Sequence, residues 1–145
     1  MKRNLLHQNA VNLEKQLFWL EHSYNECRKT GLRDSYEIQE YDSFEILSSR
    51  FARSIDFLVR KVFRSVDDAE FEAQGTLIDV VNNAHKRGLF EDIEEIKTIK
   101  DIKNDIAHEY IQDELAGLFK DLMEYTPVLI NIIQNTLRYI KDKHS

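Results

Sequence analysis

Apolar residues recur every three or four positions along most of the chain, the spacing that places them on one face of an α-helix. Over about residues 5–29 the spacings alternate between four and three, giving a heptad-like seam. Such a seam is typical of a helix packed lengthwise in a bundle or across a dimer interface. The seam consists of Leu6, Ala10, Leu13, Leu17, Leu20, Tyr24 and Cys27. Phe18 and Trp19 lie beside it, and we expect them to pack in the core or at an interface.

A second helix is predicted over about residues 44–66, where apolar residues again recur at helical spacing. The polar stretch 31–41 before it has the composition of a loop, and Asp42 or Ser43 has a side chain suited to the helix N-cap. The acidic stretch 67–74 after it is expected to be a loop or a short turn.

Three further helices complete the pattern. A shorter one at about 76–87 ends at Gly88, a residue suited to the C-terminus of a helix. A helix at about 91–110 carries a stripe of isoleucines on one face. The last helix, at about 113–141, contains Pro127, which removes one helical hydrogen bond and is expected to kink or split it.

Composition agrees with a helical fold. The chain has 145 residues, enough to bury a core, and 42% of them are hydrophobic and 32% charged. One proline and four glycines are few chain breakers, which favours long helices over a β fold with many turns. We therefore predict an all-α protein, an antiparallel bundle of four long helices plus one shorter helix, in a single domain over residues 1–145.

Charge, cysteine content and the N-terminal sequence limit the class of protein. A net charge of −6 argues against a protein dedicated to coating nucleic acid, although a local positive patch can act within a negative whole. Cys27 is the only cysteine, so no intramolecular disulfide or thiolate metal cluster can form, which suits a reducing cytosol. The N-terminus lacks the apolar run of a signal peptide, and no window is long enough to span a membrane. We therefore expect a cytoplasmic protein without a membrane segment.

The densest cluster of chemically active side chains lies near the end of the isoleucine helix. Asn104 and His108 are four residues apart, so they share a helix face, and this face lies opposite the isoleucine stripe and should point outward. Lys103 and His108 are five residues apart and point about 140° from each other on a regular helix. The side chains of Lys103 and His108 therefore cannot easily contact the same phosphate. Either the helix ends before His108, or the site is composite and uses two chains.

Cleavage of RNA without a metal needs a base for the ribose 2′-hydroxyl and a cation for the phosphorane, and His108 with a basic partner would be the minimum set. Histidine titrates near working pH, so His108 can act as a general base or acid toward a ribose 2′-hydroxyl. Lys103 supplies a cation for the phosphate, and Asn104 can orient the imidazole. No second histidine stands at ligand spacing and there is no glycine-rich phosphate loop, so we expect neither a metal nor a cofactor.

The run KNDIAHEY at residues 103–110 resembles the signature of the HEPN superfamily, a group of small all-helical proteins. That signature is an arginine, then a polar residue that is often asparagine, then a histidine. In the subfamily paired with minimal nucleotidyltransferases, a tyrosine follows two residues after the histidine. The segments 75–80 and 84–89 are also similar to the family's third helix and its turn. The chain differs from this signature at one position: residue 103 is a lysine, where the family has an arginine.

The resemblance implies a toxin-like, metal-independent RNase subunit of a bacterial toxin–antitoxin module, acting on RNA as a homodimer with a composite site. His108 would be the catalytic base or acid, Lys103 the phosphate-binding cation and Asn104 the orienting amide. Tyr110 would be the position that the partner, a small nucleotidyltransferase, modifies with AMP to silence the nuclease. From packing alone, Tyr110 is an amphipathic residue at the edge of the core.

Three alternatives stay open. Lysine lacks the planar fork with which arginine grips a phosphate, so Lys103 also suits a non-catalytic HEPN-like module that binds a nucleotide or a nucleotidyltransferase. The seam of the first helix, taken alone, suits a plain helical adaptor. On the second helix, Arg53, Arg60 and Arg64 form either a solvated face or an anion-binding patch for RNA phosphates or a nucleotide.

Overall fold

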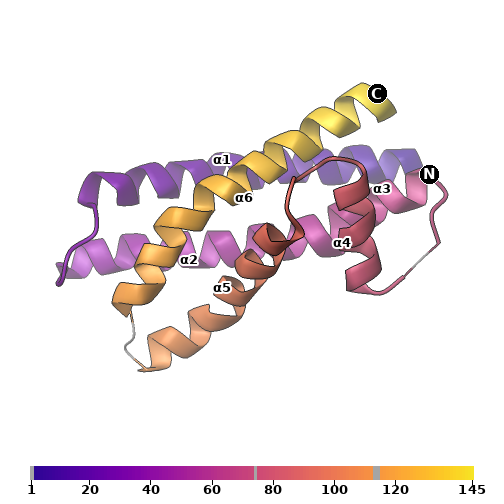
Figure 1. Cartoon of the computed structure of the whole chain (residues 1–145). Coiled ribbons are helices and arrows are strands. Elements are labelled where there is room, and N and C mark those ends of the chain that lie inside the picture. The colour runs from indigo at the N-terminus through magenta and orange to yellow at the C-terminus, as the bar shows by residue number, and fades with distance from the viewer. Residues whose placement is uncertain (1, 74, 113–114) are drawn as a thin grey trace.

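The protein is a bundle of helices (Figure 1). The computed structural model describes residues 2–73, 75–112 and 115–145. Its elements are α1 Lys2–Thr30, α2 Ile38–Phe57, the π-helix η1 Leu58–Phe63, α3 Arg64–Ala69, α4 Leu77–Lys86, α5 Ile93–Gln112 and α6 Leu115–His144. Because α2, η1 and α3 follow one another without a break, the described residues form five helices, four long and one shorter. The predicted all-α bundle is confirmed.

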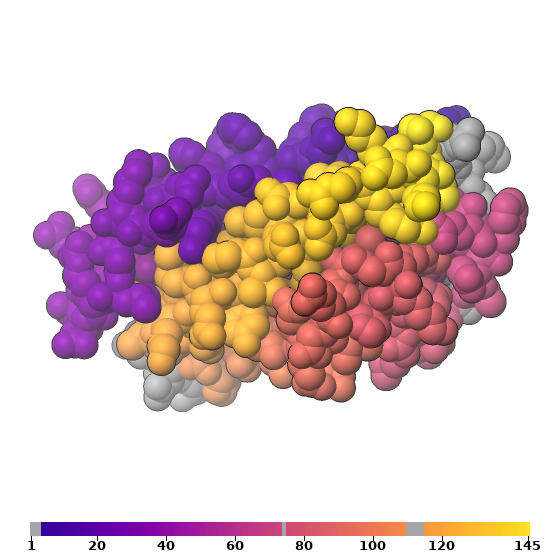
Figure 2. Space-filling model, turned by 45° about the horizontal axis from the view of Figure 1, so that its top comes forward, coloured from indigo at the N-terminus to yellow at the C-terminus, as the bar shows by residue number. Residues whose placement is uncertain are grey.

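The four long helices surround one core. α1 lies lengthwise against α2, α5 also packs on α2, and α6 contacts α1, α2 and α5. Figure 2 shows α6 crossing the molecule between α1 on one side and α4 and α5 on the other. The N-terminal end of α1 lies beside the C-terminal end of α6, where the His7 imidazole contacts the His144 carbonyl oxygen. This arrangement leaves an outer face of α2 exposed, with α1 and α5 as its neighbours.

The heptad-like seam of α1 faces the core as predicted, and its leucines are buried together with Cys27. Burial raises the pKa of the Cys27 thiol to about 12, so this thiol is neutral. Between α2 and α6 the rings of Phe44 and Phe119 stack with centroids 4.0 Å apart, and Tyr36 packs edge-on against both. Burying one such aromatic ring contributes on the order of 2 kcal/mol, so the cluster fixes α2 against α6.

The second helix begins earlier than predicted, directly after Glu37. The Glu37 backbone N–H donates to the Glu40 carboxylate at 2.8 Å, and Arg33 lies 3.1 Å from the other oxygen of that carboxylate. Glu40 therefore satisfies a free N–H at the helix start and ties it to the preceding connection. The predicted N-cap at Asp42 or Ser43 is wrong, because glutamate supplies the first-turn contact several residues earlier.

The second helix also runs further than predicted, to Ala69, so residues 67–69 are helical rather than part of a loop. It does so through η1, a π-helical segment. A π-helical turn holds more residues than an α-helical turn, and it rotates the side chains after it relative to those before it. Residues on α3 therefore do not continue the faces of α2.

The last helix continues through Pro127 from Leu115 to His144 and is not split there. Pro127 is exposed, whereas the neighbouring side chains of Thr126 and Leu129 are buried. Packing on both sides of the proline holds α6 together despite the lost hydrogen bond. In the described parts of the chain, neither α6 nor any other helix has the length and apolar character needed to cross a membrane.

Candidate functional site

The helix α5 has one buried face and one uncovered face. Ile96, Ile99 and Ile102 are at most 4% exposed, so the isoleucine stripe packs in the core as predicted. Asn104 and His108 are exposed, as their helical spacing relative to this stripe predicts. We call the surface formed by these two residues the motif face. It presents an amide and an imidazole away from the protein's own core.

Lys103 points to a different side of α5. Its Nζ lies 3.0 Å from Oδ1 of Asp56 on α2, and its side chain is 27% exposed. Nε of Arg60 lies 3.8 Å from the same oxygen. One carboxylate is thus shared between two cations. Lys103 and His108, which are both required by the predicted cleavage site, do not converge within one chain.

Two of the three arginines predicted as an anion-binding patch flank this shared carboxylate. Arg53 and Arg60 lie about one helical turn before and after Asp56. Arg64, beyond η1, instead donates to the Gly75 carbonyl oxygen at 3.1 Å. The structure therefore places Arg60, on η1, at the carboxylate that Lys103 of α5 shares, leaves Arg53 on α2 facing the α1 side, and turns Arg64 toward the connection before α4.

For two positions, Tyr110 and Asp56, the prediction from the sequence and the structure do not overlap. Tyr110, the predicted regulatory position, belongs to α5, but its side chain lies outside the described residues. Asp56 was not a sequence candidate. Its position in the sequence does indicate this role. Asp56 lies between Arg53 and Arg60 on one helix face, and an acidic residue among cations usually forms an ion pair with one of them or with a nearby lysine.

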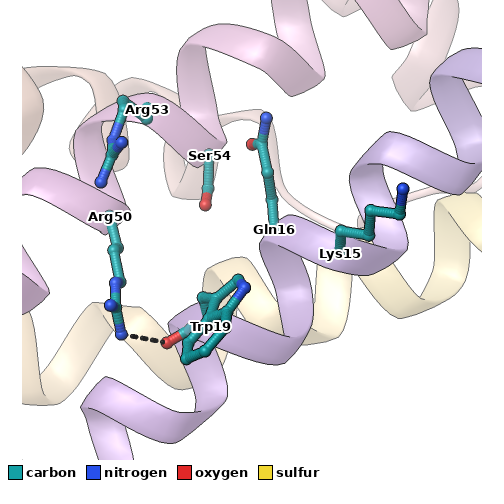
Figure 3. Close-up of a pocket in the computed structure, with 6 residues that line it drawn as sticks. All are labelled: Lys15, Gln16, Trp19, Arg50, Arg53 and Ser54. Atoms are coloured by element: carbon teal, nitrogen blue, oxygen red, sulfur yellow. Dashed lines mark hydrogen bonds between the residues drawn. The ribbon is translucent and has the colours of Figure 1, made fainter.

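A pocket of about 280 Å³ lies between α1 and α2 (Figure 3). We call it the basic pocket; its lining residues are Lys15, Gln16 and Trp19 from α1 and Arg50, Arg53 and Ser54 from α2. This lining includes three cations and no acidic residue among the described side chains. Neither Lys15 nor Arg53 forms a salt bridge within the described part of the chain. The pocket is therefore positive in a chain whose net charge is −6.

The indole of Trp19 is held at one wall of the basic pocket. Nη1 of Arg50 donates to the Trp19 carbonyl oxygen at 3.2 Å and to Ser23 Oγ at 2.6 Å, and the guanidinium lies 5.0 Å from the indole centroid. Phe18 packs edge-on against the indole with a centroid distance of 5.0 Å. Trp19 and Phe18 are 50% and 62% exposed, because they lie on α1 away from its leucine seam. The expectation that they pack in the core is wrong, and their role at an interface stays a prediction.

Gln16 contributes a polar atom without a partner to the basic pocket. Its Oε1 is buried and accepts no hydrogen bond from any described residue. In Figure 3 the Gln16 side chain extends from α1 toward Ser54 on α2. A buried acceptor without a donor costs about 1–3 kcal/mol. Because this oxygen is closed to solvent, the Gln16 amide would have to turn toward the pocket before a ligand could donate to it.

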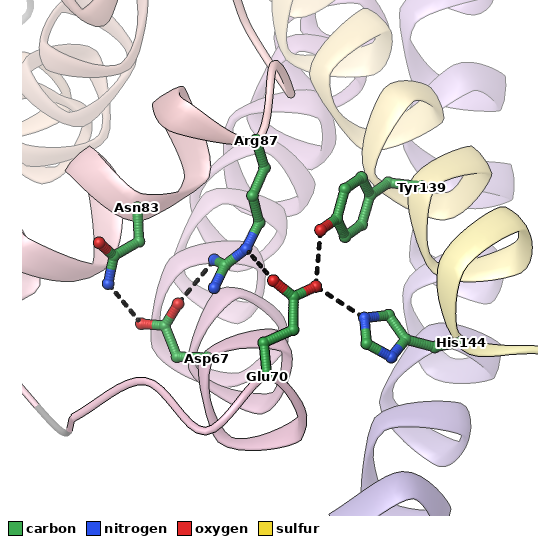
Figure 4. A network of polar contacts seen from close by, with 6 residues as sticks. All are labelled: Asp67, Glu70, Asn83, Arg87, Tyr139 and His144. Carbon is green, nitrogen blue, oxygen red and sulfur yellow. Dashed lines mark hydrogen bonds and ion pairs between the residues drawn. The ribbon is translucent and has the colours of Figure 1, made fainter.

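A separate cluster of polar side chains joins α3, α4 and α6 (Figure 4). Arg87 donates to Asp67 at 2.6 Å and to Glu70 at 2.9 Å. The other carboxylate oxygen of Glu70 accepts from the Tyr139 hydroxyl at 2.6 Å and contacts Nε2 of His144 at 2.7 Å. The side chains of Arg87 and Asp67 are only 8% and 3% exposed. These groups satisfy one another, so the cluster anchors the C-terminal end of α6 and is not a candidate ligand site.

The anchor is sensitive to acid. Burial raises the pKa of Glu70, but hydrogen bonds from Tyr139, His144 and Arg87 outweigh it and hold this pKa below its usual range. Burial and the bond to Glu70 raise the pKa of the Tyr139 hydroxyl to about 12. At neutral pH Glu70 is therefore ionised and Tyr139 is a neutral donor, which is the state that the cluster requires.

Comparison with known proteins adds no family. No protein-family model matches the sequence, and neither curated proteins nor solved structures give a significant match. Within the described residues, no group of three or more His, Cys, Asp or Glu side chains is placed to hold a metal ion. The candidate site therefore has two parts, the motif face on α5 and the basic pocket between α1 and α2, with the Lys103–Asp56 pair between them.

Proposed function

We propose that this protein is a HEPN-like, metal-independent RNase subunit of a bacterial toxin–antitoxin pair and that it cuts RNA as a homodimer. The observation that carries the proposal is the uncovered motif face near the C-terminal end of α5. Asn104, Ala107 and His108 are exposed there, whereas the isoleucines of the preceding turns are buried. An acid–base residue and an amide are thus available to RNA or to a second chain.

A two-fold dimer of the α5 ends would supply what one chain lacks. Within a chain, Lys103 turns toward Asp56 while His108 points outward. In a C2 dimer, each contact is made twice, so Lys103 of one protomer can approach His108 of the other in two equivalent sites. The small side chain of Ala107 beside His108 favours a close approach of the two helices.

The proposed chemistry uses these side chains alone. The neutral His108 imidazole takes the proton of a ribose 2′-hydroxyl, and the 2′-oxygen attacks the adjacent phosphorus. Lys103 of the other protomer stabilises the negative charge on the phosphorane oxygens, and Asn104 orients the imidazole. The bond from phosphorus to the 5′-oxygen of the next nucleotide then breaks. That oxygen takes the proton back from His108, which leaves a cyclic 2′,3′-phosphate and a free 5′-hydroxyl.

The proposed antitoxin is a small nucleotidyltransferase that transfers AMP from ATP to the Tyr110 hydroxyl and releases pyrophosphate. Tyr110 follows His108 by two residues. A phosphate attached there would place negative charge and bulk beside the imidazole, where the RNA phosphate must bind. Modification would therefore silence the nuclease by repulsion and by blocking access.

The second candidate is a non-catalytic HEPN-like module that binds a nucleotide or a nucleotidyltransferase. The Lys103–Asp56 pair favours it, because the cation expected at the phosphate is already partly neutralised at 3.0 Å. Lysine in place of arginine also removes the two-pronged phosphate contact. On this proposal the motif face binds a nucleotide or a nucleotidyltransferase and does not cleave RNA.

RNA cleavage in EDTA by purified wild-type, His108→Ala and Lys103→Arg proteins tests the proposal. His85→Ala is the matched control, because His85 is an exposed histidine on α4, away from the motif. We expect wild type and His85→Ala to cut RNA and His108→Ala to lose at least about 100-fold in rate. Lys103→Arg should cut faster, since a guanidinium can contact two phosphate oxygens.

Cleavage by Lys103→Arg alone would favour the non-catalytic module on an intact scaffold. If none of the four proteins cleaves RNA, although circular dichroism shows that all are folded, the RNase proposal is overturned.

A further inference from the structure

We propose that the basic pocket is an RNA-binding subsite outside the cleavage site, which holds one nucleotide unit of single-stranded RNA. The base would stack on Trp19, and the adjoining phosphate would bind Lys15 and Arg53. This inference deepens the proposed function and rests on it, because it names how the RNase would hold its substrate. It involves α1 and α2, neither of which carries the motif.

The charge of the pocket suits a phosphate. Lys15 lines the pocket from α1 and Arg53 lines it from α2, and neither forms a salt bridge with a carboxylate of the described residues. Arg50, the third cation, is already bound to the Trp19 carbonyl oxygen and Ser23. Within the described residues, Arg53 donates only through Nε, to the Ser49 carbonyl oxygen at 3.4 Å, so its terminal nitrogens and Lys15 are the donors available to a ligand, and both residues are exposed.

The indole suits a base. Half of the Trp19 side chain is exposed, and Arg50 and Phe18 contact it, so a flat aromatic surface is held in place before any ligand arrives. Sites for single-stranded RNA combine such aromatic surfaces with cations that follow the backbone, because every base has a face that can stack.

Gln16 could add a contact for the edge of a base. It lines the pocket, and its buried Oε1, which has no donor among the described residues, would have to turn outward to meet a ligand. Exocyclic amino groups and ring N–H groups of bases are donors that an amide oxygen accepts. Inorganic phosphate at neutral pH would satisfy the cations but gains nothing from the indole, so a base attached to a phosphate fits the whole lining better.

A strip of cations links the basic pocket to the motif helix. Arg53 lines the pocket and lies three residues before Asp56, whose carboxylate holds both Arg60 and Lys103. Lys103 is adjacent in sequence to Asn104 of the motif face. A single strand lying over the exposed face of α2 would thus pass from Trp19 across these cations to α5.

Trp19 is the only tryptophan, so its fluorescence reports on the pocket directly. The His108→Ala protein, which should not cut RNA, would be titrated with single-stranded oligoribonucleotides, with mononucleotides and with inorganic phosphate. We expect saturable quenching by the oligoribonucleotide at concentrations far below those at which a mononucleotide acts. Lys15→Ala and Arg53→Ala in the same background should each weaken binding and lower the slope of log affinity against log salt by about one. Arg138→Ala, which removes an exposed arginine on α6, is the control and should leave both unchanged.

The stacking contact needs a second readout, because removing Trp19 also removes the signal. Fluorescence anisotropy of labelled RNA should show that Trp19→Ala weakens binding by about 5- to 150-fold, the range expected for one stacked base. Trp19→Phe should restore most of that loss, since phenylalanine keeps an aromatic face. Equal losses in both variants would point to a structural role for the indole and overturn the subsite.

Other outcomes also overturn the inference. RNA binding without a change in Trp19 fluorescence would place the RNA elsewhere. Equal affinity for a mononucleotide and an oligoribonucleotide would make the pocket a site for free nucleotides. A blue shift on concentrating the protein alone, without a response to RNA, would show that another copy covers Trp19. These results are independent of cleavage by wild type, so failure of the RNase proposal and failure of the subsite are distinguishable.

Discussion

The ion pair between Lys103 and Asp56 sets how much positive charge the motif helix offers to a phosphate. The spacing of Lys103 in the motif predicts a cation, and nothing in the motif predicts that α2 supplies a carboxylate 3.0 Å away. Asp56 is 43% exposed, and pairs of this kind are worth at most about 1 kcal/mol. A phosphate can therefore compete with Asp56 for Lys103.

Asp56→Asn should strengthen RNA binding by about fivefold, the equivalent of one such pair. The substitution removes the carboxylate that Lys103 and Arg60 share and leaves both cations to the RNA. Anisotropy titrations at several salt concentrations, in the His108→Ala background, measure the change and should show a steeper salt dependence. Asp42→Asn removes an exposed acid elsewhere on α2 and is the control. An equal gain in both variants would mean that only the net charge matters.

At the scale of the elements, apolar spacing was sufficient to predict the helices but not their ends. The leucine seam of α1 and the isoleucine stripe of α5 are buried as predicted. The start of α2 differs from the prediction because its N-cap is Glu37, a residue type not favoured at that position, although Glu40 three residues later completes a capping box. The π-helical segment η1 has no spacing signal of its own, so the separation of Arg64 from Arg53 was not foreseeable.

The contact between α3 and α6 should weaken in acid. Because the pKa of Glu70 is lower in the folded protein than its ordinary value of 4.5, its ionised form stabilises the fold above about pH 4.5. This contribution is lost as the pH falls through the folded-state pKa. Glu70→Gln should cost about 2 kcal/mol at pH 7 and flatten the fall in stability below about pH 4.5.

Urea unfolding of wild type and Glu70→Gln across this pH range measures the effect. Glu45→Gln, at an exposed glutamate of α2, is the control and should behave as wild type does. If wild type and Glu70→Gln lose stability in parallel on acidification, Glu70 does not carry the acid sensitivity.

At the scale of the whole molecule, the distribution of charge matters more than its sum. A net charge of −6 coexists with cations on α2 and on its two neighbours, α1 and α5. Sequence spacing pointed to Arg53 and Lys103 separately, but it could not show that Trp19, Gln16 and Lys15 on α1 face Arg53. That pocket depends on how α1 and α2 pack side by side. The spacing of apolar residues within each helix does not show which residues of one helix lie opposite which residues of the other.

The central claim is that two chains build each cleavage site, and a heterodimer of two inactive variants tests it most directly. His108→Ala and Lys103→Ala subunits with different tags would be coexpressed, purified through both tags and assayed for RNA cleavage in EDTA. One of the two sites then joins an intact His108 to an intact Lys103, so activity should return to about half that of wild type, while each variant alone stays inactive. Lys97→Ala, at an exposed lysine of α5, should remain active and controls for the loss of charge. A heterodimer as inactive as its parents, beside an active wild type, would contradict the composite site.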